Sequence, residues 1–340
     1  MRKARIKAEN GVGFYHVTSR IVDRSFKMDE GEREIFRHIL RKAAAFSGVN
    51  VLTYAILSNH FHVLLDVPVQ PVLDDAELLR RIAVLYGVAE ANLRRECWEG
   101  WRKGGLDVLV EQEQEQLRVR MGDVSPFMKL LKQRYSISYN QRHTRTGTLW
   151  EGRYASILVE GENRALSTIA AYIDLNPVRA GIVKDPADYR WSGYGEACGG
   201  SVTARQGLRA VQSFSQQAQD GSWAGTAAAY RTYLYIHGEE RRDEGGRLQR
   251  LGFSPAEAQE VIDRGGRMAL PNLLRCRVRY FRNGLAFGSK AFVEAVFDRN
   301  RAHFSAKRKT GARRMRFCPD GGFCVARDLR VEPVSVSVRT

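Results

Sequence analysis

Two short apolar runs joined by a turn are the feature that most constrains the fold. Residues 51–57 and 61–67 are each rich in branched and aromatic side chains, which favour β-strands. Ser58 and Asn59 between them have turn chemistry, and Pro68 closes the second run. The pattern therefore predicts two adjacent strands with a tight connection.

The flanking segments extend this pair into a mixed α and β pattern. We predict a strand over 14–22, a helix over 31–46, and later a basic helix over 127–139. A strand over 155–159 and a helix over 163–176 follow, with Pro177 expected to stop that helix. The β-α-β-β start predicts an α+β fold, an antiparallel sheet with helices on one face, ferredoxin-like in style.

Composition divides the chain into a first domain and an extension. Residues 1–200 carry the pattern above, interrupted at about 74–122 by a segment with a helical apolar stripe, which we interpret as a helical insertion. Residues 201–225 are rich in Gly, Ser, Gln and Ala and mark the boundary. Residues 201–340 are predicted to be a basic, mainly helical C-terminal extension with a DNA-binding or accessory role.

The charge balance points to a polyanionic partner. Lys plus Arg number 54 against 38 Asp plus Glu, which gives a net charge of +16 and a pI near 9.9. A membrane is the weaker choice, because no apolar run approaches the ~20 residues of a spanning helix and the first residues lack a signal-peptide stretch. We therefore expect a cytoplasmic, nucleoid-associated nucleic-acid-binding protein without a membrane partner.

The five cysteines support neither a disulfide framework nor a zinc finger. They are odd in number and scattered, and no two form a CxxC pair. A reducing compartment fits this usage. The five positions are Cys97, Cys198, Cys276, Cys318 and Cys324.

The second apolar run begins with His60-Phe61-His62. Residues i and i+2 of a strand point to the same face, so His60 and His62 project together while Phe61 points to the other side. Two neutral imidazoles at this spacing can hold a divalent cation from one side and leave positions open for substrate. The alternative is two unrelated polar residues near the start of a strand.

A metal beside a phosphodiester calls for a nucleophile, and the helix over 163–176 offers one. Tyr172 can form a covalent phosphoryl intermediate, and Asn176 lies one turn later on the same helical face, where its amide oxygen could complete a metal shell. Core packing is the alternative role of a helical tyrosine. The rival nucleophiles are Tyr135, Tyr139 and Tyr154.

Four segments in succession resemble one known family. They are 15–20 (YHVTSR), 58–65 (SNHFHVLL), 147–153 (GTLWEGR) and 172–179 (YIDLNPVR). Their order is similar to that of the motifs of the single-tyrosine HUH transposases, in the branch associated with repetitive extragenic palindromes (REP). The resemblance spans roughly residues 11 to 195.

The resemblance implies a metal-dependent transposase or nicking endonuclease with an HUH nuclease core. In that family the HUH histidines hold Mg²⁺ or Mn²⁺, and a tyrosine attacks single-stranded DNA near hairpins, leaving a 5′-phosphotyrosine and a free 3′-OH. Mapped onto this chain, His60 and His62 are metal ligands, Asn176 is a third ligand, and Tyr172 is the nucleophile. The insertion and the extension exceed the family core, so the DNA target and the choice between monomer and homodimer do not carry over.

DNA contact is expected from the basic helix and the loop that follows it. As a cluster these cations can form a phosphate track, although each one alone is more often a solvated surface charge than a DNA contact. The candidates are Lys129, Lys132, Arg134, Arg142, Arg145 and Arg153.

Two other functions remain open on the sequence. His16-Val17-Thr18 prompts a two-histidine phosphoesterase, but His60-Phe61-His62 does not supply the second HxT or HxS motif, so His16 is assigned to the sheet as a strand residue. The other is a noncatalytic, domesticated transposase that binds DNA hairpins without cutting them.

Overall fold

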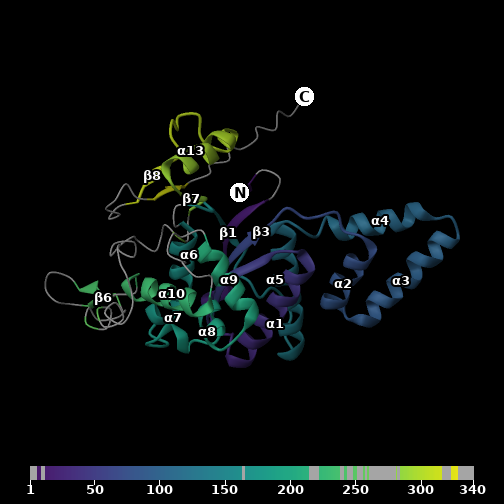
Figure 1. The fold of residues 1–340 in the computed structure, drawn as a ribbon, viewed down its shortest axis with the longest axis horizontal. Coiled ribbons are helices and arrows are strands. Elements are labelled where there is room, and N and C mark those ends of the chain that lie inside the picture. Colours follow the sequence, from purple (N-terminus) through teal and green to yellow (C-terminus); the bar gives the residue numbers. More distant parts are fainter. Residues whose placement is uncertain are drawn as a thin grey trace.

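The computed structural model shows an α+β protein built around one large mixed sheet (Figure 1). No helix in the described part of the chain is long and apolar enough to cross a bilayer. The described residues are 6–8, 12–162, 165–213, 222–237, 241–242, 248–250, 256, 259, 281, 284–315 and 323–327.

Four strands from the first half of the chain carry the candidate site. They pair in the order β2-β3-β1-β4, and each neighbouring pair is antiparallel. The two apolar runs form β2 and β3, and the Leu57 N–H donates to the His60 carbonyl at 2.8 Å to close the turn between them. The four strands are β1 (Gly13–Arg20), β2 (Asn50–Ile56), β3 (His60–Val67) and β4 (Ala155–Val159).

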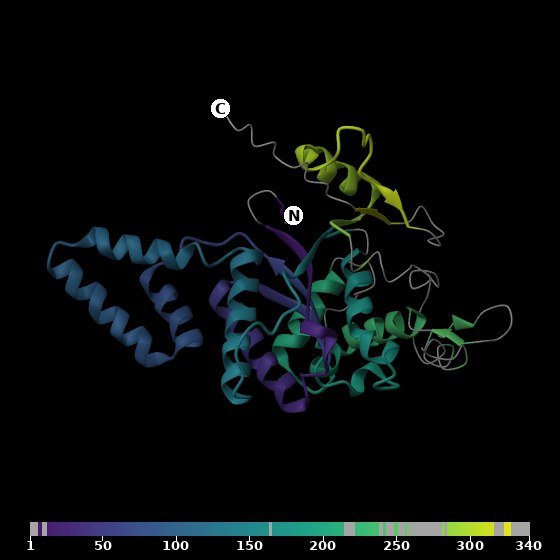
Figure 2. The ribbon, with the colours of Figure 1, turned by 180° about the vertical axis from the view of Figure 1, so that it is seen from behind.

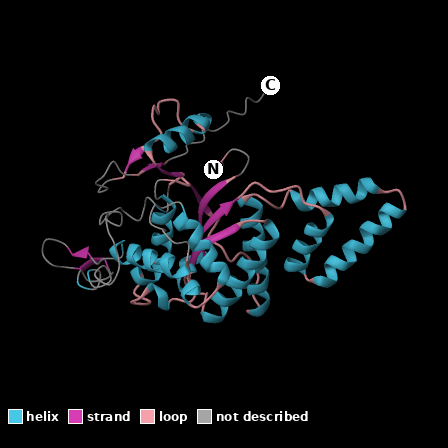
Figure 3. Cartoon of the chain, viewed as in Figure 1, coloured by secondary structure: helices cyan, strands magenta, loops and turns pink. Residues whose placement is uncertain are grey.

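Helices cover both faces of the sheet, so the expectation of helices on one face is wrong (Figure 3). One face packs α1 and α5 against Phe61 and Val63, and the other packs α6 and α9 against Leu52 and Leu64. The reason is visible in β2 and β3, which are buried along nearly their whole length instead of alternating with polar residues. The four helices are α1 (Glu30–Ser47), α5 (Val124–Arg142), α6 (Ala165–Asp174) and α9 (Val202–Ser213).

The C-terminal part of the chain lengthens the same sheet. β7 (Ala286–Gly288) pairs with β4 in parallel, and β9 (Cys324–Ala326) and β8 (Arg313–Arg314) follow antiparallel. The full order is β2-β3-β1-β4-β7-β9-β8, and the sheet is mixed. The sequence had predicted an antiparallel sheet. Strands of two or three residues are too short to produce a readable period, so these strands were not predicted, although the described part of the extension holds more helix than strand.

Three helices project from the body as an arm (Figures 1 and 2). They have their own apolar cluster, in which Leu78, Trp98 and Val110 are buried together with Phe46 from α1. All three lie within the segment interpreted as a helical insertion. Their bounds are α2 (Asp75–Tyr86), α3 (Val88–Lys103) and α4 (Asp107–Arg118).

The helix that carries Tyr172 ends earlier than expected. α6 ends at Asp174, and Pro177 does not stop a helix but lies in the first turn of the next one, α7 (Asn176–Arg179). This position tolerates proline because the first N–H groups of a helix need no intrahelical acceptor. Residues 163–164, at the expected start, lie outside the described residues.

The remaining elements lie mainly in the second half of the chain. They are α8 (Gly193–Cys198), α10 (Trp223–His237), β5 (Arg241–Arg242), β6 (Leu248–Arg250), α13 (Lys290–Arg299) and short 3-10 helices at Val22–Arg24, Pro186–Asp188 and Arg301–His303.

Candidate functional site

The register of β1 on β3 places several polar side chains on one face of the sheet. Arg20 pairs with His60 and Thr18 pairs with His62, so these four residues share a face. Phe61 is buried in the cluster on the opposite face. The two histidines therefore project together, as period-two alternation predicts.

A third imidazole lies against the pair. His16 is fully buried on β1, and its Nε2 is 3.0 Å from Nδ1 of His62. The two rings stack with centroids 5.2 Å apart and planes 21° from parallel. Sequence reasoning assigned His16 to the sheet but did not connect it to His62. The sequence could have indicated this contact only through strand alternation, which places His16 and His62 on one face once the register of β1 on β3 is known.

Tyr172 packs edge-on against both of these histidines. Its ring centroid is 5.6 Å from that of His62 and 5.9 Å from that of His16. Phe281, from the C-terminal part of the chain, covers another side at 4.7 Å, and Tyr172 is only 1% exposed. The structure thus brings the predicted nucleophile to one of the predicted metal ligands, His62, and encloses it there.

The rival tyrosines lie elsewhere. Tyr135, Tyr139 and Tyr154 all belong to the apolar cluster on the opposite face of the sheet. The Tyr135 hydroxyl donates to the Glu32 carboxylate at 3.0 Å, and burial together with that carboxylate raises its pKa. Tyr172, by contrast, packs against His62 and is the best placed of the four.

Residues one and two turns after Tyr172 hold its backbone. The Asn176 amide nitrogen donates to the Tyr172 carbonyl at 2.7 Å and to the Ile173 carbonyl at 3.3 Å. Arg179 donates to the same Tyr172 carbonyl at 3.2 Å, and its guanidinium lies 5.1 Å from the centre of the Tyr172 ring. Asn176 therefore orders the end of α6, and Oδ1 is the atom with which it would reach a metal.

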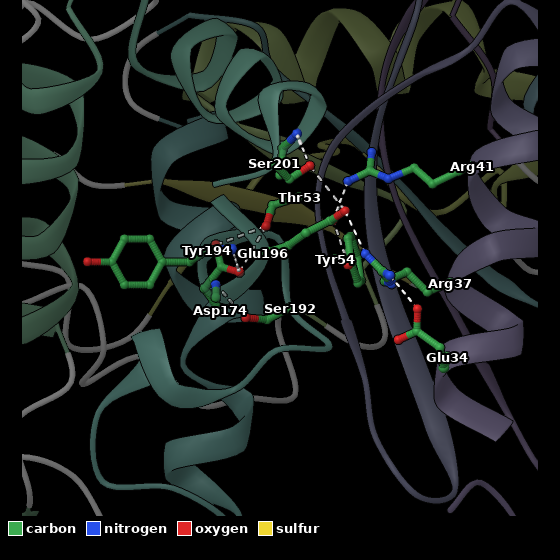
Figure 4. A network of polar contacts seen from close by, with 12 residues as sticks. Glu34, Arg37, Arg41, Thr53, Tyr54, Asp174, Ser192, Tyr194, Glu196 and Ser201 are labelled. Carbon is green, nitrogen blue, oxygen red and sulfur yellow. Dashed lines mark hydrogen bonds and ion pairs between the residues drawn. The ribbon is translucent and has the colours of Figure 1, made fainter. Parts of the chain in front are cut away.

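A buried carboxylate anchors the same helix to the sheet (Figure 4). Asp174 accepts hydrogen bonds from the Thr53 hydroxyl at 2.9 Å, the Tyr230 hydroxyl at 2.6 Å and the Tyr194 N–H at 3.1 Å. Complete burial raises the pKa of this carboxyl to about 7, although all three donors favour the charged form. The anchor connects α6 to β2, α8 and α10 and so fixes the position of Tyr172.

A pocket of about 270 Å³ opens beside the histidine pair. Its cations are Arg20 and Arg153, and its carboxylate is Glu151, whose backbone N–H donates to the Arg20 carbonyl at 2.9 Å. This bond holds the 147–153 loop against the end of β1. The full lining is Thr18, Ser19, Arg20, His60, His62, Glu151, Gly152, Arg153 and Ala155.

The donor set of this pocket fits a divalent cation held from one side. His60 and His62 both line the pocket, and their ring centroids are 5.2 Å apart. The Nδ1 atom of His60 is 2.6 Å from Asn59 Oδ1, and that of His62 contacts His16. In the described ranges no three His, Cys, Asp or Glu side chains together form a metal site, so a cation here would depend on further ligands from substrate, water or an amide.

Three of the predicted DNA contacts lie next to this pocket. Arg153 lines it and also lines a wider groove of about 860 Å³, together with Arg120, Lys129 and Lys132. Lys132 donates to the Gly152 carbonyl at 2.7 Å. Pocket and groove share Gly152 and Arg153, so a basic track leads from the α5 surface to the histidine pair.

The other three predicted DNA contacts form hydrogen bonds or ion pairs within the protein. Arg134 donates to the Leu85 carbonyl at 3.1 Å, and Arg145 donates to the Thr148 carbonyl at 3.2 Å. Arg142 forms an ion pair with the buried Glu32 at 2.7 Å. These bonds give each of the three arginines a structural role that the sequence did not reveal.

Comparison with solved structures finds a structural likeness. The chain is similar to a solved structure of a REP-associated tyrosine transposase bound to a REP hairpin, at 15% identity and a TM-score of 0.37, covering 60% of this chain and 88% of that one. No family model and no curated protein matches. The functional assignment therefore depends on the side chains of the site itself.

Proposed function

We propose that this protein is a metal-dependent transposase or endonuclease that cleaves and rejoins single-stranded DNA near hairpins through Tyr172. The observation that carries the proposal is the packing of Tyr172 against His62, beside a pocket that His60, His62 and two arginines line. The motif resemblance and the net charge of +16 support the same reaction class.

Each residue of the site has its own role in the proposed reaction. Tyr172 Oη gives up its proton to solvent and attacks the phosphorus, the bond from phosphorus to the 3′ oxygen breaks, and that oxygen takes up a proton while the tyrosine keeps the 5′ phosphate. His60 and His62 would hold Mg²⁺ or Mn²⁺, which when bound supplies Lewis-acid stabilisation of phosphate charge. Asn176 is proposed as a third ligand. Arg20 and Arg153 face the same pocket and would orient the phosphodiester.

Burial of Tyr172 gives the reaction a conformational requirement. With Tyr172 1% exposed and Phe281 against its ring, DNA can reach the hydroxyl only if side chains that enclose Tyr172, Phe281 among them, move. The same observation favours a second candidate function, a hairpin-binding protein that does not cleave. The two candidates differ in whether a covalent adduct ever forms.

The test is capture of that adduct. Single-stranded oligonucleotides with hairpins, including any inverted repeats that flank the gene, are incubated with the protein and either Mn²⁺ or a chelator. We expect a covalent protein–DNA band that requires Mn²⁺ and is lost in Tyr172→Phe, which keeps the ring and removes only Oη.

Matched variants identify the nucleophile. Tyr135→Phe and Tyr139→Phe should keep the band, because both rings lie on the other face of the sheet. An adduct that survives Tyr172→Phe would overturn the assignment of the nucleophile. Tight hairpin binding with no adduct for any oligonucleotide would favour the binding-only function.

A further inference from the structure

The contact between His16 and His62 carries an inference that rests on the proposed metal site. His16 is fully buried and comes from a different strand than His62. Its Nε2 is within hydrogen-bond distance of His62 Nδ1, at 3.0 Å. We infer that His16 is a positioning residue that holds His62 as the tautomer with its proton on Nδ1, so that Nε2 is the metal-binding nitrogen.

The chemistry of imidazole allows two arrangements of this contact. A neutral histidine has one N–H and one acceptor nitrogen, so a bond between two rings needs a donor on one and an acceptor on the other. If His62 donates from Nδ1, its Nε2 lone pair can bind a cation. If His16 donates from Nε2 instead, the proton of His62 lies on Nε2, and that nitrogen cannot bind a metal.

The contact of His60 favours the arrangement in which His62 donates from Nδ1. His60 Nδ1 lies 2.6 Å from Asn59 Oδ1, and a side-chain amide oxygen only accepts. His60 therefore carries its proton on Nδ1. With His62 in the same state, both histidines would present Nε2 to one cation, which matches the usual support of metal-ligating histidines by a neighbour on their other nitrogen.

The packing of His16 suits it to this role. The ring is stacked on His62 with planes 21° apart and touches the edge of Tyr172 at 5.9 Å between centroids. Neither ring can turn without disturbing the other two. A core histidine that only fills space would also lower stability when replaced, so the test needs a measurement that packing alone does not change.

The tautomer can be read directly by NMR of protein labelled with ¹⁵N-histidine, in the absence of metal. We expect His62 to carry its proton on Nδ1 in the wild type and in His16→Gln, whose amide oxygen can accept the bond. In His16→Phe we expect a mixture of tautomers. Observation of the Nε2–H form of His62 in the wild type would overturn the inference.

Manganese binding by calorimetry provides the second readout. His16→Phe should weaken Mn²⁺ binding by roughly 10–100-fold, the usual effect of removing an outer-shell partner, and His16→Gln should restore much of it. His38→Phe, on the exposed side of α1, is the matched control and should bind as the wild type does. Equal affinity in His16→Phe and the wild type would refute the role.

The two readouts separate this inference from the proposed function. A wild-type protein that binds no Mn²⁺ would count against the metal site, while the tautomer of His62 would still decide the role of His16. If His16→Phe fails to fold, the wild-type tautomer and the His16→Gln titration decide it.

Discussion

The buried carboxyl of Asp174 predicts an unusual dependence of stability on pH. Its pKa is about 7 in the folded protein, against 3.8 for an ordinary aspartate, because burial disfavours the charged form. The folded state therefore binds more protons than the unfolded state between these values. Linkage then requires that this group's contribution to stability is full below the unfolded pKa and falls as the pH rises toward the folded pKa.

The size of the effect follows from the two pKa values. At 1.36 kcal/mol for each pH unit between them, the loss amounts to roughly 4 kcal/mol from about pH 4 to about pH 7. Asp174→Asn removes the titration while keeping an acceptor for Thr53 or the Tyr194 N–H. As the pH rises across this range, the unfolding free energy of the wild type should therefore fall by roughly 4 kcal/mol relative to that of the variant.

Urea unfolding at several pH values measures this difference. Asp188→Asn, at an exposed position, is the matched control and should show no comparable trend. A constant difference between Asp174→Asn and the wild type from about pH 4 to about pH 8 would refute the reasoning, because it would mean that Asp174 titrates alike in both states. Hydrogen bonds from Thr53 and Tyr230 would then offset the effect of burial on the Asp174 pKa.

Three further predictions test the packing and the interface. Gly207→Ala should lower the unfolding free energy by about 1–3 kcal/mol, because the new Cβ would lie 2.5 Å from a backbone carbonyl oxygen of β2. The control Gly100→Ala has open space around the new Cβ and should raise the unfolding free energy by about 1 kcal/mol. Equal effects of the two substitutions in urea unfolding would contradict this prediction. Arg153→Gln should weaken single-stranded DNA binding and reduce the salt slope of log K by roughly 0.7, measured by fluorescence anisotropy, and an unchanged slope would remove Arg153 from the interface. Phe281→Ala should make Tyr172 accessible to nitration, detected by mass spectrometry, and lower stability by about 3–5 kcal/mol; a Tyr172 that stays protected would show that Phe281 is not its cover.

Local pattern accounts for the parts of the site that were predicted well. His60 and His62 share a face because every strand alternates its side chains, whatever the strand packs against. The same rule placed Phe61 in the opposite cluster, as found. Helical spacing likewise predicted that Asn176 lies near Tyr172, and its amide does contact the Tyr172 carbonyl.

What the sequence did not reveal is contact between distant segments. Arg142, a predicted DNA contact, forms an ion pair with Glu32, which is 110 residues away in the chain. Nothing near Arg142 in the sequence indicates this partner. The helices on the second face and the strands added by the C-terminal part were missed for the same reason, since each depends on what the sheet packs against and not on its own period.

The sequence by itself determined which side chains can act together within one element, above all the histidine pair of β3. Only the tertiary structure decided that His16 contacts His62, that Tyr172 lies against both, and that Phe281 packs on the tyrosine ring. The physical reason is that alternation along a strand follows from backbone geometry residue by residue. Strand register and helix packing, by contrast, depend on how the whole chain buries its apolar surface.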